Sequence, residues 1–550
     1  MYILFPGRHL VLTQFQEWYL RQVLVQDMQQ VYVDGKKPKG AVLDTIIFTI
    51  TSANFDSSRY SPVPLMFRIA AIQAFASQLE KEFNIKTHII AVPHYPQNDR
   101  FARQIISEIH EQTEGEITIT PKNTLVLTST KEVGQQYKKL GYSILPAEAS
   151  PDLQNAPQRQ TPSNLIKIIA EANQKKPWYN ITAVRNCLHP ATRNLWMSAP
   201  WIVSRIKRLW TDPLLNDSGD LTSERDYQSY AIGMSNPAIM SIKYNELKPF
   251  IKEGKIADEG CADGALLSFI AKDFPDSDLL GVEITGAFYQ RCLAAQQAGF
   301  FGKSFIHFHQ RNILQPLFRE NSIDTTLCNS TLHELWSYVK QESTLDSYLK
   351  LKFKQLKPGG ILAARDVVGP KNGTKKVLLW CNKKNGSNSA PLKSFKSKKD
   401  LTTYLKKLST HARFIRFAQD YLHDISKNRR SAPRIKYKIV TIKGTEYFQL
   451  TLKDATEFLT KMSYVDNWTS EMNEEFAFYD IDDWKRKLRK HGFQVVETKD
   501  GKPATRTYSS SWIKEHVWQD SVKLFEIKNN IVVPHEFPVT NMILVAQKPL

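Results

Sequence analysis

A loop with two glycines and neighbouring acids is the first feature of this sequence that suggests chemistry. The stretch KIADEGCADGALLSF, residues 255–269, reads as a buried strand, a loop holding Gly260 and Gly264, and the start of a helix. In such a unit, glycines let the backbone approach a ligand, and the helix N-terminus offers unpaired N–H groups. The three residues between these glycines, CAD, carry side chains. The loop therefore disfavours a pyrophosphate and allows a smaller, zwitterionic or cationic ligand.

Two carboxylates are spaced around this loop in a way that extends the prediction. Asp258 stands two residues before the first glycine, where a carboxylate can meet a ligand cation or ammonium. Glu283 ends the next apolar run, LLGVEI, 25 residues beyond Asp258. An acid at such a strand end can accept hydrogen bonds from both hydroxyls of a ribose. The loop and the spaced acid together favour a ligand that carries a ribose.

Further candidates follow the fourth and fifth apolar runs of this region. His333 and Glu334 come after DTTLCNS, and histidine is the usual base near neutral pH, but both residues can equally cap or pack the next helix. Arg365 and Asp366 end the fifth run and form either a structural ion pair or part of an acceptor site. Four aromatic residues either cover the ligand or belong to the core: Tyr227, Tyr230, Trp336 and Tyr338.

Composition limits the class of protein that positions these residues. The chain has 550 residues, 42% of them hydrophobic, with 28 Phe, 21 Tyr and 11 Trp, which predicts a globular protein of two to four domains. No apolar run of about 18 residues and no export signal are found, so we expect a cytoplasmic protein without a membrane span. Its five cysteines never form a CxxC pair, which argues against disulfides and against a metal site.

The positive charge is concentrated in one segment. The formal net charge of the chain is +19, and residues 371–438 hold 19 Lys or Arg against three Asp, a net of +16. This segment also contains NGSNSAP and reads as an insertion. It is either a solvated, partly mobile surface or an anion-binding face.

Alternation of apolar runs and helical stretches predicts two doubly wound α/β domains. Residues 1 to about 165 alternate β-rich runs such as DTIIFTITSA with helical stretches, which implies a parallel sheet, and residues 164–215 look helical. A second set of seven strands follows, with helices between the first five. Its members are KIADEG, DLLGVEI, SFIHFHQ, DTTLCNS, GGILAARDVV, GFQVVET and TNMILVAQ.

The second set resembles the class I S-adenosylmethionine-dependent methyltransferases over residues 216–370 and 475–550, with 371–474 as a lysine-rich insertion. Asp258, Gly260, Cys261 and Gly264 match the DxGCGxG loop of that family, with Ala262 replacing its middle glycine. The resemblance implies a seven-stranded Rossmann-like sheet with S-adenosylmethionine as the cofactor. Glu283 then holds its ribose and Asn312, in HQRNIL, flanks its adenine. IDTTLCNSTLHEL and LKPGGILAARD are similar to the fourth motif and to the turn before strand five.

The N-terminal part, residues 1–215, resembles nucleotidylyltransferases of the nicotinamide-nucleotide adenylyltransferase type. FPGRHLVLTQFQ matches their opening through Gly7 and Arg8, and Ser52 and Arg68 match the residues of a later loop and helix. Where the family has HxGH, this chain has TQFQ, from Thr13 to Gln16, so it lacks the histidines that hold a triphosphate. The resemblance implies nucleotide binding at these positions without efficient nucleotidyl transfer.

The predicted function is methyl transfer from S-adenosylmethionine to a small, anionic or nucleotide-linked metabolite. Three alternatives remain. One is a bifunctional enzyme that uses both domains, another is an RNA methyltransferase that uses the basic insertion, and the third is a non-catalytic nucleotide-binding protein. No RNA-binding module and no NPPY-like motif occur in the sequence, which favours the small acceptor. The acceptor and the oligomeric state do not follow from these patterns.

Overall fold

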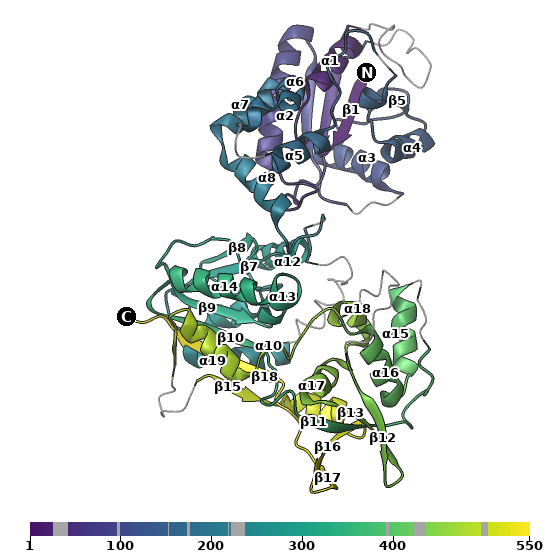
Figure 1. Cartoon of the computed structure of the whole chain (residues 1–550). Coiled ribbons are helices and arrows are strands. Elements are labelled where there is room, and N and C mark those ends of the chain that lie inside the picture. The colour runs from purple at the N-terminus through teal and green to yellow at the C-terminus, as the bar shows by residue number, and fades with distance from the viewer. Residues whose placement is uncertain are drawn as a thin grey trace. The chain divides into compact units, whose positions relative to one another are not determined.

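The computed structural model describes most of the chain and divides it into two compact units, Met1–Asp220 and Leu221–Leu550 (Figure 1). The described residues are 1–25, 42–95, 99–151, 153–172, 177–217, 219–221, 237–391, 395, 397–422, 435–496 and 504–550. Among them, no helix combines the length and the apolar character that a membrane crossing requires.

The first unit contains a parallel five-stranded sheet in the order β3-β2-β1-β4-β5, as the alternating pattern predicts. Its strands are β1 (Tyr2–Gly7), β2 (Thr45–Ile50), β3 (Lys86–Ala91), β4 (Thr124–Leu127) and β5 (Ser143–Leu145). Neighbouring residues of β1 enter different cores, with Ile3 and Phe5 in one and Leu4 in the other. A strand covered on both faces must be apolar on both, which explains the continuous apolar runs.

Helices connect these strands and then form a separate layer. The connecting helices are α1 (Gln14–Leu24), α2 (Leu65–Phe83), α3 (Phe101–Gln112) and α4 (Lys131–Lys139). After η1 (Ala147–Ala149) come α5 (Pro162–Glu171), η2 (Trp178–Asn180), α6 (Thr182–Cys187), α7 (Pro190–Ser198) and α8 (Trp201–Thr211). This later layer packs on the loop after β1, because Leu10 and Val11 share a buried cluster with residues of α5 to α8.

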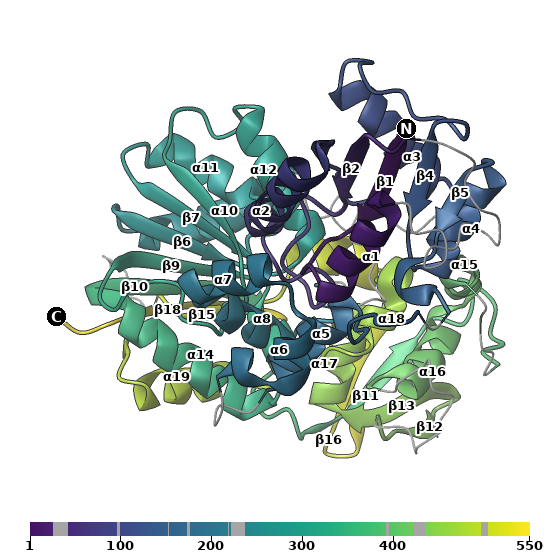
Figure 2. The same ribbon diagram turned by 90° about the horizontal axis from the view of Figure 1, so that it is seen from above.

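The second unit contains a sheet whose main path is β14-β18-β10-β9-β6-β7-β8 (Figure 2). The strands are β6 (Lys255–Glu259), β7 (Asp278–Glu283), β8 (Ile306–Gln310), β9 (Ile323–Asn329), β10 (Leu356–Val367), β14 (Gln494–Val495) and β18 (Asn541–Gln547). The first five are parallel, and β18 is antiparallel to both β10 and β14. All seven strand segments predicted for this domain are strands, and an eighth, β15 (Arg506–Tyr508), also pairs with β18.

The helices of this sheet bring the ends of neighbouring strands together. They are α10 (Pro237–Leu247), η3 (Lys248–Phe250), α11 (Ala265–Asp273), α12 (Gly286–Gln297), α13 (Leu332–Ser337), α14 (Gln341–Gln355) and α19 (Ile481–Lys490). The order of the first five strands places a switch point between β6 and β9, where successive connections leave in opposite directions. Ligands of open α/β sheets bind at the carboxyl ends of strands beside such a point.

The basic segment belongs to a folded layer with its own five-stranded sheet, in the order β12-β13-β11-β16-β17. The strands are β11 (Lys376–Cys381), β12 (Lys438–Ile442), β13 (Thr445–Thr451), β16 (Val522–Lys528) and β17 (Ile531–Pro534), all paired antiparallel. Its helices are α15 (Lys398–Lys407), α16 (Thr410–Asp420), α17 (Leu452–Lys461), α18 (Trp468–Glu471) and α20 (Ser511–Ile513), with η5 (Val465–Asn467) and η6 (Lys514–Trp518).

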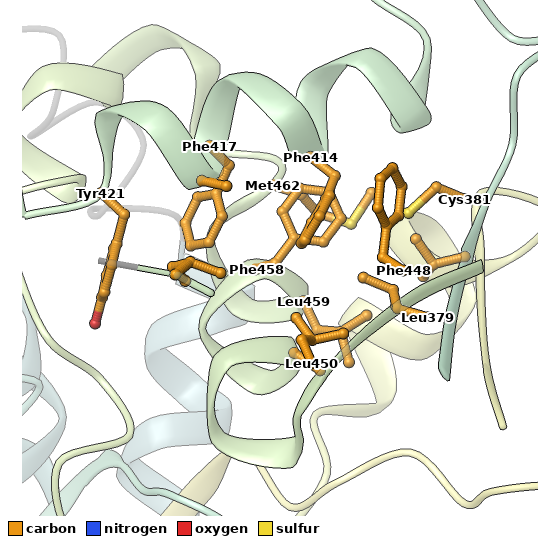
Figure 3. Close-up of a cluster of buried hydrophobic side chains, with 14 of the residues drawn as sticks. Leu379, Cys381, Phe414, Phe417, Tyr421, Phe448, Leu450, Phe458, Leu459 and Met462 are labelled. Carbon is orange, nitrogen blue, oxygen red and sulfur yellow. The ribbon is translucent and has the colours of Figure 1, made fainter. Parts of the chain in front are cut away.

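A large aromatic core holds this layer together, so the described part of the segment is not the loose, solvated surface that its charge allowed. Phe414 and Phe417 of α16 and Phe458 of α17 pack on Phe448 of β13 and its neighbours (Figure 3). Strands β16 and β17 come from beyond residue 474 and complete the sheet. The layer is therefore built from two insertions into the larger sheet, one after β10 and one after β15.

Candidate functional site

The predicted glycine loop lies at the carboxyl end of β6, beside the switch point. Gly260 and Gly264 have φ values of 76° and 81°, in the left-handed region that favours glycine. A Cβ on Gly260 would stand 2.3 Å from the Oγ1 of Thr331, so a side chain has no room there. Ala262 also has a positive φ, 49°, and therefore keeps the backbone shape of the glycine that it replaces. The loop forms the tight turn that the sequence predicts.

Glu283 ends β7 and ties this loop to the next one. Its Oε2 accepts the backbone N–H of Ala262 at 3.0 Å, and its Oε1 accepts that of Thr285 at 2.8 Å. The side chain is 7% exposed, and burial raises the pKa of the carboxyl to about 7, although the bond from Thr285 opposes the rise. Each carboxylate oxygen keeps a further lone pair, so Glu283 can still accept from ribose hydroxyls.

Asp258 presents a buried carboxyl oxygen that lacks a hydrogen-bond partner among the described residues. The residue is 1% exposed, and the unpaired atom is Oδ1. Burial, together with the nearby charges of Glu259 and Glu283, raises the pKa of Asp258 to about 7, while Lys243 opposes the rise. An unpaired buried carboxyl oxygen is costly in a folded protein. The site therefore suits a ligand that supplies a positively charged donor.

Lys243 of α10 is a residue of this site that the sequence reading missed. It is 6% exposed, and burial together with Arg365 lowers the pKa of its ammonium to about 8, while Asp366 and Asp258 oppose the shift. Its charge thus acts on the same buried region as that of Asp258. No motif marks this lysine, because it belongs to a helix before the first strand.

Asn312, predicted beside the adenine, follows β8 and is 5% exposed. Its Oδ1 accepts the N–H of Leu314 at 2.9 Å, and the N–H of its neighbour Arg311 binds the carbonyl of Glu283 at 2.8 Å. The loops after β6, β7 and β8 are thus joined through Glu283, and the predicted cofactor residues lie together.

His333 is clamped between two buried carboxylates. Its Nδ1 lies 2.6 Å from the Oδ1 of Asp366, at the end of β10, and its Nε2 lies 3.4 Å from the Oε2 of Glu474, in the insertion. Burial alone lowers the pKa of His333, but the two acids outweigh it and hold the pKa well above its usual value. An imidazolium whose two nitrogens both face carboxylates is a poor proton acceptor. This environment favours a positioning role for His333 over the predicted role as a base.

The same clamp fixes the start of α13. The Oδ2 of Asp366 accepts the backbone N–H groups of Thr331 and Leu332 at 3.0 and 2.6 Å. Thr331 is the residue that crowds Gly260. The clamp therefore supports one wall of the glycine loop.

Glu334, the second predicted catalytic residue, is half-buried on α13. Its charge contributes to the raised pKa of Glu283, which places the two carboxylates near each other. Its charge is therefore part of the surroundings of the predicted ribose acid.

Other singled-out residues have structural contacts. Arg365 forms an ion pair with Glu246 at 2.6 Å. Trp336 and Tyr338 donate to the carboxylates of Glu475 and Glu474, both at 2.8 Å, and attach α13 to the insertion. Tyr227 and Tyr230 lie outside the described residues.

In the first unit, the structure gathers the predicted residues at the ends of β1 and β2, but several of them support the backbone. Arg68 is 1% exposed, and its guanidinium donates to the carbonyls of Arg8, Thr51 and Ser52 at 2.9–3.0 Å. Burial lowers the pKa of this guanidinium to about 10. Arg68 thus joins the loop after β1, which begins with Arg8 directly after Gly7, to the loop after β2.

Thr13 and Gln16 form a capping box at the start of α1, at the positions of the missing histidines. The Oγ1 of Thr13 accepts from the N–H of Gln16 at 3.1 Å, and the Oε1 of Gln16 accepts from the N–H of Thr13 at 3.2 Å. Gln16 also donates to Glu148 at 2.8 Å. Both side chains are buried and occupied, so the geometry disfavours their predicted part in nucleotide binding.

Arg8 and Ser52 lie near a histidine that the sequence reading missed. The Oγ of Ser52 is 3.0 Å from the Nδ1 of His94, and the charge of Arg8 acts on that imidazole. The guanidinium of Arg8 lies 3.5 Å above the ring of Tyr60 and donates to its carbonyl. Arg8, Ser52 and His94 thus form a polar group that carries a guanidinium.

Comparisons with known proteins find a domain match within the second unit. Residues 251–426 match a protein family described as a methyltransferase domain. The match begins just before β6 and spans all five parallel strands. No curated protein matches the chain.

Solved structures that resemble the chain include three S-adenosylmethionine-dependent methyltransferases. The one from Methanosarcina mazei is 14% identical, with 55% of this chain and 97% of that chain covered and a TM-score of 0.27. The one from Thermotoga maritima is 13% identical, with 59% and 97% covered and a TM-score of 0.28. The one from Mesorhizobium loti is 11% identical, with 56% and 97% covered and a TM-score of 0.29. Likeness at this level says nothing of the acceptor. The family match thus gives the second unit a region similar to methyltransferase domains, over residues 251–426.

Proposed function

We propose that the second unit transfers a methyl group from S-adenosylmethionine to a small, anionic or nucleotide-linked acceptor. The observation that carries this proposal is the pair of buried carboxylates around the glycine loop, Asp258 and Glu283, within a matched methyltransferase domain. Bound there, S-adenosylmethionine supplies an electrophilic methyl group on a sulfonium ion.

The residues of the site suit each part of this cofactor. The carboxylate of Glu283 can accept from the two ribose hydroxyls, and Asn312 lies in the loop where the adenine is expected. The unpaired Oδ1 of Asp258 suits the ammonium of the methionine end. Lys243, whose charge acts on the same region, suits the methionine carboxylate. Opposite charges on protein and ligand thus meet at the zwitterionic end, as buried charges require.

Positioning and exclusion of water then account for most of the expected rate enhancement. Methyl transfer needs the acceptor atom in line with the reacting carbon, which makes alignment the main contribution of the protein. His333 holds α13 against the loop through Asp366 and Glu474 and so fixes one wall of the site. Because both of its nitrogens are engaged, the proposed reaction assigns no proton transfer to it.

For the first unit we propose binding of a nucleotide or phosphorylated ligand without efficient adenylyl transfer. The observation that favours it is the group formed by Arg8, Ser52 and His94 at the ends of parallel strands. The capping box at Thr13 and Gln16 supplies no cation for a triphosphate in the transition state.

The experiment that tests the methyl transfer is a mass-spectrometric search in cell extract. Protein and S-adenosylmethionine carrying a trideuterated methyl group are added, and metabolites that gain the label are identified. The proposal predicts one or a few labelled small molecules that carry a phosphate or carboxylate. The proposal is contradicted if the wild-type chain labels no metabolite. It is also contradicted if a Glu283→Ala variant labels the same metabolites to the same extent.

A further inference from the structure

The insertion sheet has two different faces. One face carries Val377 and Leu379 of β11, Phe448 of β13 and Leu524 of β16, which enter the core under α16 and α17. Side chains alternate along a strand, so the residues between them lie on the opposite face. We call this the outer face. Figure 1 shows the five strands with the helices α16 and α17 beside them.

Three aromatic side chains lie together on the outer face, on three adjacent strands. They are Tyr447 on β13, Trp380 on β11 and Phe525 on β16, and all are half-buried. The ring centroids of Tyr447 and Phe525 are 5.5 Å apart. Leu378, paired with Phe525, occupies the same face and is 1% exposed, so other groups cover it. We call the three rings and Leu378 the apolar platform.

Lysines surround this platform. Lys376 of β11, Lys438 of β12 and Lys523 of β16 are exposed and occupy outer-face positions. The Nζ of Lys523 lies 5.6 Å from the centre of the Trp380 ring. Within these five described strands, every outer-face position is apolar, neutral or basic. The outer-face positions of these strands therefore combine aromatic rings with lysines and carry no acidic residue.

We propose that the outer face binds single-stranded nucleic acid. Unpaired bases stack on aromatic rings whatever their sequence, and lysines neutralise the phosphates between them. Of the ligands that carry negative charge, a single strand is the one that also brings a row of flat apolar groups to meet three rings. This inference goes beyond methyl transfer and does not rest on it.

The binding test uses the full chain and a fluorescently labelled 12-nucleotide uridine RNA, followed by anisotropy. A duplex RNA of equal length is the comparison, since its bases are already stacked and cannot lie on the rings. We expect the single strand to bind at least tenfold more tightly than the duplex. With three phosphates neutralised, a rise from 50 to 200 mM salt should weaken binding by about 18-fold.

Variants separate stacking from charge. Trp380→Ala should weaken binding by about tenfold, as loss of one stacked base does, and Trp380→Phe should restore most of it. The double change Lys376→Glu and Lys523→Glu should weaken binding at least as much and flatten the salt dependence. Two controls lie off the outer face. They are Tyr464→Ala, a 42% exposed tyrosine after α17, and Lys399→Glu, an exposed lysine of α15; each should leave binding within about twofold.

Thermal unfolding and S-adenosylmethionine affinity are measured on every variant. If Trp380→Ala is poorly folded, the exposed lysine pair decides the test. Equal binding of duplex and single strand, or equal loss in the variants and the controls, would overturn the proposal. So would an absence of RNA binding combined with self-association that Trp380→Ala abolishes, because the face would then be an interface between copies of the chain. Loss of RNA binding with intact cofactor affinity leaves the methyltransferase proposal standing.

Discussion

Replacing Lys243 by methionine should weaken S-adenosylmethionine binding through one end of the cofactor only. Methionine keeps the length of the side chain and removes its charge. Lys243 is 6% exposed and its charge acts on Asp258, so the proposed contact to the methionine carboxylate is a buried, charge-assisted one. Such contacts contribute about 1.5–3 kcal/mol, which corresponds to roughly a 10- to 150-fold loss of affinity.

The same change has a second effect at the same end. Lys243 lowers the pKa of Asp258, which burial has raised to about 7, so its loss raises that pKa further. Asp258 is then less charged at neutral pH and attracts the methionine ammonium less. Both effects concern the amino-acid end, and the adenosine end is untouched.

Isothermal titration calorimetry with two ligands makes this distinction measurable. S-adenosylmethionine is compared with methylthioadenosine, which shares the adenosine and the sulfur but lacks the zwitterionic end. Lys243→Met should weaken the first by at least tenfold and leave the second within about twofold. Equal losses for both ligands would show that Lys243 only supports the fold, and no loss for either would remove it from the site.

Three further predictions concern stability and the first unit. The pKa of Asp258 is raised from 3.8 to about 7 in the folded state, so the free energy of unfolding falls as pH rises between these two pKa values. Asp258→Asn should flatten this fall, measured by urea unfolding at pH 5 and 8, and should weaken cofactor binding. An unchanged pH dependence of stability in the variant would refute the raised pKa. The pKa of His333 is raised in the folded state, so the stability that its charged form contributes is full below about pH 6.5 and is lost as pH rises through the folded-state pKa. His333→Gln should lower the free energy of unfolding by about 3 kcal/mol at pH 6 and by less at alkaline pH. A loss of stability that grows with pH would contradict the clamp. Thr13→Ala should destabilise the first unit by about 1 kcal/mol through loss of the capping box, as measured by urea unfolding. The wild-type chain should release little pyrophosphate from ATP and a mononucleotide, and rapid release would show that the first unit catalyses adenylyl transfer.

The sequence predicted those parts of the fold whose signals are local. The strands β6 to β10 are apolar runs bounded by turns, and the glycine loop and Glu283 follow directly from where two of those runs end. Strand β16 was missed because its partner β11 lies far away in the chain, and β17 joins the sheet through its hairpin with β16. For the same reason the basic segment showed little aromatic content near its lysines, since Phe525 lies beyond that segment and joins it only through the pairing of β16 with β11.

The site shows the same division between local and distant information. Asp258 and Gly260 are recognisable by their spacing, but the role of His333 depends on Asp366 from β10 and Glu474 from the insertion. Sequence reasoning could propose His333 as a base but had no means of seeing that two carboxylates hold its proton. Thr13 and Gln16 likewise matched positions of a motif, and only the capping geometry reveals what they do.

Calorimetric titration of the wild-type chain with S-adenosylmethionine, beside a Glu283→Gln variant, tests the central claim most directly. Glutamine keeps an acceptor oxygen for one of the two backbone N–H groups that Glu283 binds, turns its NH2 toward the other, and lacks the charge that strengthens the bonds to ribose. We expect one binding site per chain and a loss of one to two kcal/mol, or roughly five- to thirtyfold, in the variant, and thermal unfolding checks that the variant is folded at the temperature of the titration. A folded wild-type chain that gives no heat with S-adenosylmethionine, or a variant that binds as tightly as the wild type, would contradict the assignment of this site.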